Sequence, residues 1–210
     1  EEYGRLLGFR VVCCDPPRMR LTPGLGFLTL DELLSLSDIV TLHVPFTTEG
    51  PDKTAGMASG EFFARMRPGS AFINCSRGPV MQDGPLLDAL RKGHIAYAAI
   101  DTWNHEPGID RELLARAFCA TPHIAGYSEQ GKANASAAVV AAAAKHFGLP
   151  PEGWYPTGVT QVGRRPISWA EMRATITDYF DIDGQSRTLK AAPEQFETLR
   201  EEYIFRQEYF

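Results

Sequence analysis

The sequence predicts an α/β fold built on a doubly wound parallel sheet, with helices on both faces. Short apolar runs alternate with amphipathic segments as far as residue 147, as in chains whose parallel strands are joined by crossover helices. Polar motifs directly follow several of the apolar runs, and open α/β sheets bind their ligands at the carboxyl ends of the strands. Capping residues, prolines and glycines separate the segments and place their boundaries.

The first part of the chain predicts three strands and two helices. Asp15 and the two prolines after it end the first apolar run and begin a loop. Thr29 and Glu32 have the spacing of a capping box, and Ser59 can cap the second helix. The expected elements are a strand at 9–14, a helix at 30–36, a strand at 38–45, a helix with Phe62, Phe63 and Met66 on one face, and a strand at 70–74.

The alternation continues through the middle of the chain. Asp83 and Asp110 stand where helix-capping residues are expected, and Gly93 lies just past the end of the helix that Asp83 begins. The expected elements are a helix that follows Asp83 and runs to Arg91, a strand at 95–100, a helix at 111–117, a short strand at 118–121 and a long alanine-rich helix at 133–147.

The character of the chain changes after residue 148. Residues 149–166 contain four prolines and three glycines and read as a linker. Beyond it, Ser168 can cap a helix at 169–180, and Pro193 can start another that runs from 194 to about 209. Ten of the 22 aromatic residues lie between Trp154 and Phe210, so this part is expected to pack on another surface, either a second subunit or its own domain.

Composition narrows the classes of function. The net charge of −5 argues against a nucleic-acid partner or an anionic membrane surface, and no apolar run has the roughly 18 residues that a membrane helix needs. The four cysteines include no Cys-x-x-Cys pair, which disfavours structural zinc and suits free thiols in the cytoplasm. We therefore expect a cytoplasmic protein that acts on a small molecule.

Three chemical groups follow successive predicted strands. Arg77, beside Gly78, could hold a carboxylate in a two-bond fork and polarise a carbonyl at C2. Glu106 and His123 follow the next two strands, and a carboxylate bonded to an imidazole orients the ring for accepting a hydroxyl proton. Singly, these residues suit a surface ion pair or a core histidine. Together they predict a site that oxidises a 2-hydroxy acid, with a His–Glu–His metal site through His105 as a weaker alternative.

Two acidic residues are candidates for binding a dinucleotide. Asp15 ends the first predicted strand, where an acid can accept hydrogen bonds from the adenosine ribose and disfavour a 2′-phosphate, so NAD is expected rather than NADP. Alone, Asp15 would read as a turn residue. Asp101 could accept a hydrogen bond from the nicotinamide amide, or could cap a turn. The glycine-rich phosphate loop is expected about 20 residues before Asp15, upstream of this chain.

These residues resemble the D-2-hydroxyacid dehydrogenases, NAD-dependent enzymes with a Rossmann-type cofactor domain. The resemblance covers residues 1 to about 148 and rests on Asp15, His43-Val44-Pro45, Pro68-Gly69, Ile73-Asn74, Ser76-Arg77-Gly78, Asp101, Glu106-Pro107 and His123-Ile124-Ala125-Gly126. It implies that Arg77, Glu106 and His123 are catalytic, with Arg77 also binding substrate, and that Asp15, Val44, Asp101 and Gly126 contact NAD.

Further motifs resemble one branch of that family, whose members oxidise a phosphorylated four-carbon 2-hydroxy acid. They are Cys14-Asp15-Pro16-Pro17-Arg18, Gly50-Pro51-Asp52-Lys53-Thr54, Tyr127 with Glu129-Gln130-Gly131-Lys132-Ala133, and Phe196-Glu197-Thr198-Leu199-Arg200. The resemblance implies a substrate contact at Tyr127. It also implies a homodimer formed through a small C-terminal α+β domain at 167–210, which follows an NAD-binding domain at 1–148 and the linker. The substrate domain that family members carry at their N-terminus is absent from this sequence.

Two alternatives stay open at this point. One is a dehydrogenase for another D-2-hydroxy acid, such as glycerate or phosphoglycerate. The other is a protein of the same fold that senses NAD(H) and changes partners, as corepressors of this superfamily do. The presence of Arg77, Glu106 and His123 together favours catalysis.

Overall fold

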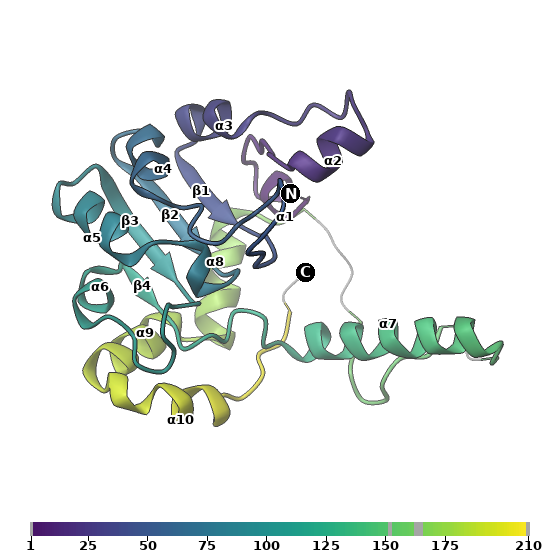
Figure 1. The fold of residues 1–210 in the computed structure, drawn as a ribbon. Coiled ribbons are helices and arrows are strands. Elements are labelled where there is room, and N and C mark those ends of the chain that lie inside the picture. The colour runs from purple at the N-terminus through teal and green to yellow at the C-terminus, as the bar shows by residue number, and fades with distance from the viewer. Residues whose placement is uncertain (1, 151–152, 162–165, 209–210) are drawn as a thin grey trace. The chain divides into compact units, whose positions relative to one another are not determined.

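The computed structural model describes residues 2–150, 153–161 and 166–208 (Figure 1). Its internal contacts divide the chain into two units. The first unit contains residues 1–123 and 182–202, and the second contains residues 124–181 and 203–210. The predicted domain boundaries at 148 and 166 therefore differ from this division, and they stay a prediction.

The first unit is built on a parallel sheet with the order β1-β2-β3-β4 (Figure 1). The strands are β1 (Ile39–Leu42), β2 (Ser70–Asn74), β3 (Ile95–Ile100) and β4 (Cys119–Ala120). Each strand pairs in parallel with the next, so the carboxyl ends of all four lie at one edge of the sheet. The predicted α/β class is confirmed, and the bounds of β2 and β3 agree with the sequence pattern.

Local capping explains where the helices of this unit begin. The Thr29 hydroxyl accepts from the Glu32 amide while the Glu32 carboxylate accepts from the Thr29 amide, which confirms the capping box. Ser59 and Asp110 accept from the Phe62 and Leu113 amides and confirm two further caps. Helix α3 (Leu30–Leu36) precedes β1, and the helices that cross between strands are α4 (Gly60–Arg65), α5 (Asp83–Arg91) and α6 (Arg111–Arg116).

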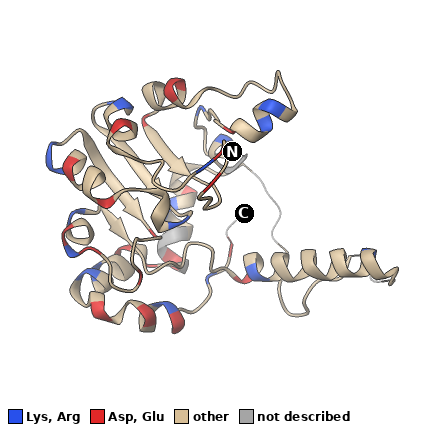
Figure 2. Cartoon of the chain, viewed as in Figure 1, with Lys and Arg blue, Asp and Glu red and all other residues tan. Residues whose placement is uncertain are grey.

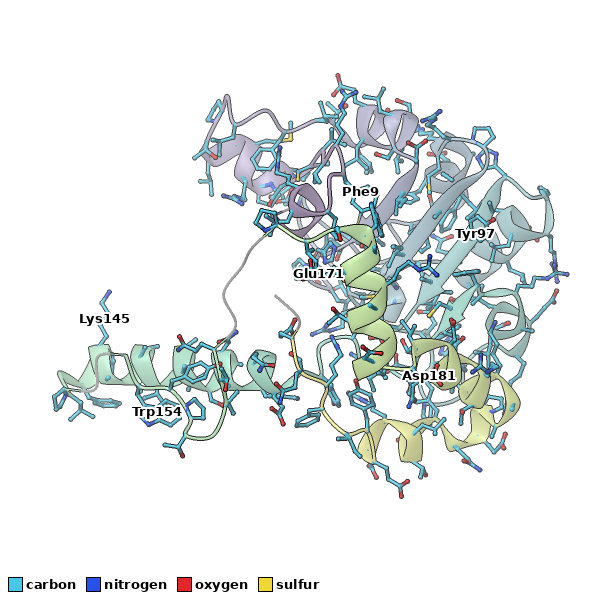
Figure 3. All side chains as sticks on the ribbon, turned by 180° about the vertical axis from the view of Figure 1, so that it is seen from behind. Phe9, Tyr97, Lys145, Trp154, Glu171 and Asp181 are labelled. Carbon is cyan, nitrogen blue, oxygen red and sulfur yellow. The ribbon has the colours of Figure 1, made fainter. Side chains whose placement is uncertain are left out.

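The core of this unit lies between the sheet and these helices. Phe62 and Phe63 of α4 and Phe72 of β2 are almost fully buried, and their rings meet edge to face with centroids 5.1–6.1 Å apart. The predicted apolar face of α4 is thereby confirmed. Tyr97 of β3 and Phe118 form a separate edge-to-face pair that stays exposed (Figure 3).

The predicted strand at 9–14 is wrong. Residues 9–15 have no regular structure, and the backbone bond from the Leu28 amide to the Cys13 carbonyl, 2.8 Å, does not extend into a ladder. An apolar run becomes a strand only when a neighbouring strand satisfies its backbone, and the described sheet does not include one beside it. The loop expected after Asp15 is instead helix α2 (Pro16–Leu21), preceded by α1 (Glu2–Leu6).

The predicted cap at Asp83 is also wrong. Gln82 occupies the N-cap position of α5 and makes no side-chain cap bond, whereas Asp83 is the first helical residue. The Asp83 carboxylate accepts instead from the Asn104 side chain at 2.7 Å. Burial is the main cause that raises the pKa of Asp83. The carboxylate oxygen that was expected to cap the helix is thus bound by the side-chain amide of Asn104, which lies in a distant loop.

The last elements of the first unit cover the outer edge of β4. They are α9 (Ile182–Ala191), a 3₁₀ turn at Pro193–Gln195 and α10 (Phe196–Glu201). The buried Ser186 hydroxyl accepts from the Ala120 amide at 3.0 Å, in the place of a further strand. Helix α9 was not predicted, and the helix expected from 194 to about 209 ends at Glu201. Glycine, serine and threonine within α9 weaken its helical pattern.

The second unit is dominated by α7 (Glu129–Phe147). Ser128 caps α7, so the helix starts four residues before the predicted 133, and Gly148 ends it in the left-handed conformation at φ 63°. Charged side chains of α7 stand near its two ends only (Figure 2). Residues 153–161 run beside it, where the Gln130 side chain donates to the Thr160 carbonyl at 3.1 Å (Figure 3).

The remaining helix of the second unit is α8 (Trp169–Tyr179), whose predicted cap at Ser168 is confirmed by a 3.1 Å bond from the Glu171 amide. Within the described part of residues 167–210 the regular elements are helices, and strand-type pairing is limited to an isolated bridge between Ser128 and Arg206. Of the helices that the structure describes, none is long and apolar enough to cross a membrane.

Candidate active site

The loops after β2, β3 and β4 meet at the carboxyl edge of the sheet. The Asp101 amide donates to the Asn74 carbonyl at 3.0 Å, and the His123 amide donates to the Asp101 carbonyl at 2.8 Å. These bonds continue the sheet contacts beyond the strands, so the three loops are held side by side. All three predicted catalytic residues, Arg77, Glu106 and His123, lie on them.

The loop that carries Arg77 is shaped by Asn74 and Gly78, two residues of the sequence motifs for which no structural role was predicted. The Asn74 amide group donates to the carbonyls of Arg77 (3.1 Å) and Thr102 (3.3 Å), and its oxygen accepts from Ser76. At Gly78 the loop passes so close to its neighbour that an added Cβ would lie 1.8 Å from the Trp103 carbonyl oxygen. A buried asparagine after a strand and a following glycine are the signals that could have revealed both.

Arg77 itself is exposed at this edge. Its guanidinium donates one hydrogen bond, 2.6 Å long, to the carbonyl oxygen of Ser76 in the same loop. A guanidinium has five N–H donors, so this bond leaves most of its capacity for a ligand. Arg77 can therefore bind an anion that enters beside the loops.

Glu106 and His123 form the pair that the sequence predicted. The Nδ1 atom of His123 lies 2.9 Å from Oε2 of Glu106, and both side chains are about three-quarters buried, at 25% and 21% exposure. The other carboxylate oxygen accepts from the Trp103 amide at 2.7 Å. The carboxylate is thus fixed on both sides, and the contact at Nδ1 leaves Nε2 as the imidazole nitrogen for a substrate.

The surroundings of Glu106 favour its ionised form. Burial acts to raise its pKa, but the hydrogen bonds from His123 and from the Trp103 amide outweigh burial and hold the pKa below its usual value. The positive charge of Arg200, on α10, adds to this lowering. An ionised Glu106 is an acceptor only, which requires His123 Nδ1 to carry the proton that they share.

Backbone conformation is unusual at two positions of the site. His105 and His123 both have φ of 58°, in the left-handed region that non-glycine residues seldom occupy. Such strain persists only where surrounding contacts hold it, and it gathers at functional sites. His105 is exposed, and the described residues contain no group of three His, Cys, Asp or Glu side chains arranged for a metal.

The candidate cofactor residues of the first unit lie at different places. Asp101 is 3% exposed at the end of β3 and accepts from the Thr121 hydroxyl at 2.6 Å. Val44 lies two residues past β1, half-buried against the core. Asp15 stands apart from the sheet as the N-cap of α2, where it accepts from the Arg18 amide at 3.0 Å. The structure thus places Asp101 directly after β3 and Asp15 outside the described sheet.

The other two candidates belong to the second unit. Gly126 is exposed, and Tyr127 is half-buried with its ring 5.6 Å from that of Phe205. The Lys132 ammonium lies 4.0 Å from the centre of the Tyr127 ring, so a cation–π contact joins two residues of the same sequence motif.

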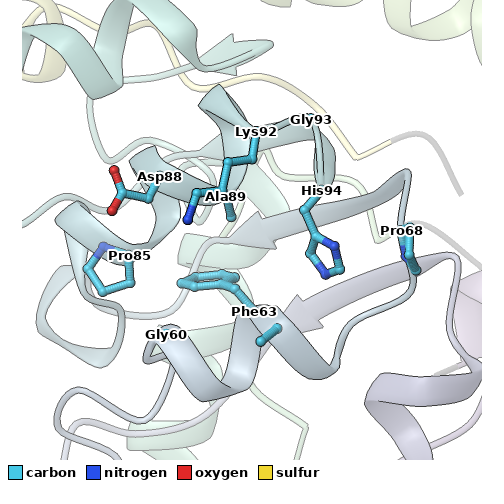
Figure 4. Close-up of a pocket in the computed structure, with 10 residues that line it drawn as sticks. Gly60, Phe63, Pro68, Pro85, Asp88, Ala89, Lys92, Gly93 and His94 are labelled. Carbon is cyan, nitrogen blue, oxygen red and sulfur yellow. The ribbon is translucent and has the colours of Figure 1, made fainter.

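A separate hollow lies between α4 and α5 (Figure 4). Pro68 and His94, which line it, precede β2 and β3, so the hollow lies toward the amino ends of the strands. Nε2 of His94 is buried without a hydrogen-bond partner among the described residues. Because the catalytic candidates lie at the carboxyl ends, this hollow is not part of their site.

Comparison with known proteins places this geometry in a family context. Residues 2–125 match the family model described as D-isomer specific 2-hydroxyacid dehydrogenase, NAD binding domain. The chain is 38% identical over 207 residues to an erythronate-4-phosphate dehydrogenase of Bacteroides fragilis, covering 99% of this chain and 59% of that protein. It is 35% identical over 212 residues to the enzyme of that name from Cronobacter sakazakii, covering 97% and 56%.

A solved structure supports the fold. The chain is similar to a D-lactate dehydrogenase from Treponema pallidum, with a TM-score of 0.55 and 30% identity over 71% of this chain and 49% of that one. The chain spans less than two thirds of the length of these curated relatives.

Proposed function

We propose that this chain, which belongs to the D-isomer specific 2-hydroxyacid dehydrogenase family, is the catalytic and cofactor-binding part of an NAD-dependent 4-phospho-D-erythronate dehydrogenase. Its product would be 2-oxo-3-hydroxy-4-phosphobutanoate, made on the route to pyridoxal 5′-phosphate. The observation that carries the proposal is the Glu106–His123 pair at 2.9 Å, on loops joined to the one that bears Arg77. The name shared by relatives from two genera supports the substrate.

The residues present suit NAD as the cofactor. Asp101 is a buried carboxylate at the carboxyl edge of the sheet, where an acceptor can meet the carboxamide of a nicotinamide. Asp15 uses one oxygen to cap α2, and a carboxylate has further acceptor sites for ribose hydroxyls. We assign Asp15, Val44, Asp101 and Gly126 to cofactor binding, and the bound NAD would take up the hydride from C2 of the substrate.

His123 is proposed to act as the general base for oxidation. Its Nδ1 faces Glu106, so Nε2 accepts the proton of the C2 hydroxyl as the C2–H bond breaks. The imidazolium that forms is stabilised by the ionised Glu106. In the reverse direction the same atom returns the proton to the carbonyl oxygen.

Arg77 is proposed to bind the substrate carboxylate and the oxygen at C2. Its exposed guanidinium can offer two parallel donors to a carboxylate, which fixes both position and orientation. The same positive charge favours electron density on the C2 oxygen during oxidation. Tyr127 is proposed as a further substrate contact on the strength of the family resemblance.

The proposed protein is a cytoplasmic homodimer that binds no nucleic acid. Four free cysteines suit a reducing compartment. Aromatic side chains such as Trp154 and Trp169 are 44% and 54% exposed, which supports a covering surface from a second copy through residues 167–210 and their linker.

Turnover by the complete protein tests the function. We expect NAD reduction, followed at 340 nm, with 4-phospho-D-erythronate to exceed that with D-erythronate, D-glycerate and 3-phosphoglycerate. Equal or better rates with a three-carbon acid would reassign the substrate. Tight NADH binding without turnover of any of these acids would point to the sensing alternative.

Removing the charge of Glu106 tests the proposed acid–base pair. In Glu106→Gln, the side-chain oxygen can still accept from Nδ1, but it carries no charge to stabilise the imidazolium that forms when His123 takes up the C2 hydroxyl proton. The maximal rate of oxidation is therefore expected to fall, while NADH affinity stays close to that of the wild type. The rate is measured at saturating NAD, and an unchanged kcat would show that Glu106 does not act through His123.

A further inference from the structure

The end of the chain runs beside the start of α7 in the second unit. Arg206 forms an isolated parallel bridge with Ser128, and its carbonyl accepts from the Glu129 amide at 2.9 Å. Two residues further on, the Glu208 amide donates to the Gln130 side chain at 2.8 Å. Residues 203–208, here termed the C-terminal strap, are therefore tied to the beginning of the helix by one backbone bond and one bond from a backbone amide to a side chain.

The side chain of Arg206 reaches the segment that precedes α7. Nη2 donates to the Ala125 carbonyl at 2.6 Å, and Nη1 donates to the carbonyls of Tyr127 at 3.1 Å and Ile124 at 3.3 Å. These carbonyls belong to a four-residue turn, which we term the 124–127 turn. One planar guanidinium thus donates charge-assisted hydrogen bonds to three backbone carbonyls of the turn.

The strap also surrounds the side chain of Tyr127. The Tyr127 ring lies 5.6 Å from the ring of Phe205 and 6.4 Å from that of Tyr203, and the Lys132 ammonium lies within 5.4 Å of Phe205. The Arg206 guanidinium is itself 5.8 Å from the Phe180 ring. The strap therefore determines both the backbone of the turn and the direction of its aromatic side chain.

We propose that Arg206 is a positioning residue, which holds the 124–127 turn so that Gly126 and Tyr127 are presented to cofactor and substrate. The inference rests on the proposed function, because the roles of Gly126 and Tyr127 come from it. Arg206 acts through three backbone carbonyls and touches neither reactant.

The consequence is a specific kinetic defect. Without the guanidinium, the carbonyls of Ile124, Ala125 and Tyr127 each lose a charge-assisted hydrogen bond, and the turn can relax into other conformations. Displacements of about 1 Å in positioning groups cost on the order of 10²-fold in rate. We expect Arg206→Gln to lower kcat/KM for the hydroxy acid about 10²-fold, with increases in KM for the acid and in Kd for NADH.

The experiment compares Arg206→Gln and Arg206→Lys with Ile204→Ala, all in the complete protein. Ile204 is in the same strap but is 89% exposed, so its truncation is the matched control. Lysine keeps the positive charge but lacks the fork, and it is expected to fall between the wild type and Arg206→Gln. Hydrogen exchange of the amides of residues 125–131 is measured alongside turnover and NADH affinity, with the amides of 95–100 as a reference for global stability.

The expected result is faster exchange at 125–131 but not at 95–100, together with the kinetic loss, in the Arg206 variants only. If Arg206→Gln speeds exchange in both 125–131 and 95–100, it has destabilised the whole protein, and the same comparison is then made with the milder Arg206→Lys. Wild-type exchange at 125–131 would overturn the clamp, and faster exchange with unchanged kinetics and NADH affinity would overturn its positioning role. Absence of turnover in the wild type would instead count against the proposed function, while exchange and NADH affinity would still decide the role of Arg206.

Discussion

Replacing His123 by Asn is expected to lower kcat for oxidation about 10³-fold and to leave NADH affinity within a few fold of the wild type. Asparagine can still donate to Glu106, so the contact that now spans 2.9 Å has a substitute. It cannot accept a proton near neutral pH, and a positioned general base contributes about 10²–10⁴-fold. The measurement is steady-state NAD reduction at saturating substrates, with NADH fluorescence for affinity.

His146→Asn is the matched control for this prediction. His146 is exposed near the end of α7, far along the chain from the catalytic loops, and the substitution is chemically identical. Its kcat is expected to match the wild type. If His123→Asn retained a tenth or more of wild-type kcat, another group would have to serve as the base.

Replacing Gly78 by Ala is expected to reduce the free energy of unfolding by about 3 kcal/mol or more. The new methyl carbon would lie 1.8 Å from the Trp103 carbonyl oxygen and 2.6 Å from the Asn104 nitrogen, and both are backbone atoms that cannot rotate away. The loops after β2 and β3 would have to separate, and overpacking of this kind costs about 1–3 kcal/mol, occasionally more. Urea denaturation gives the free energy, with the m-value as a check on two-state behaviour.

Gly84→Ala supplies the control at a site with space. An added Cβ at Gly84 meets nothing within 4 Å, and the residue lies in the first turn of α5. Alanine there is expected to be neutral or to stabilise by up to about 1 kcal/mol, because it restricts the unfolded chain and favours the helix. Equal stabilities for the two variants would contradict the close approach at Gly78.

Much of the first unit could be predicted because its signals are local. The bounds of β2 and β3, the capping box at Thr29 and the caps at Ser59 and Asp110 each depend on a few neighbouring residues. The Glu106–His123 contact was also predictable, because parallel strands carry the residues that follow them to a common edge.

What could not be predicted depends on partners distant in sequence. Residues 9–14 have the composition of a strand, but a strand also needs a neighbour to pair with, which no local pattern reveals. Asp83 has the right position for a cap, yet its carboxylate is bound by Asn104, 21 residues away. The contacts of Arg206 with the 124–127 turn span about 80 residues. No local sequence pattern therefore distinguishes this arginine from the other polar residues near it.

The two carboxylate oxygens of Glu106 bind different partners. One contacts the imidazole of His123, and the other accepts a hydrogen bond from the backbone amide of Trp103. The carboxyl group therefore works as a rigid crosspiece between the ends of two adjacent strands. Any shift of the Trp103 backbone is transmitted directly to the ring. An aspartate has the same charge, but its side chain is one methylene shorter and could not span both partners. The length of the glutamate side chain therefore matters here as much as its charge.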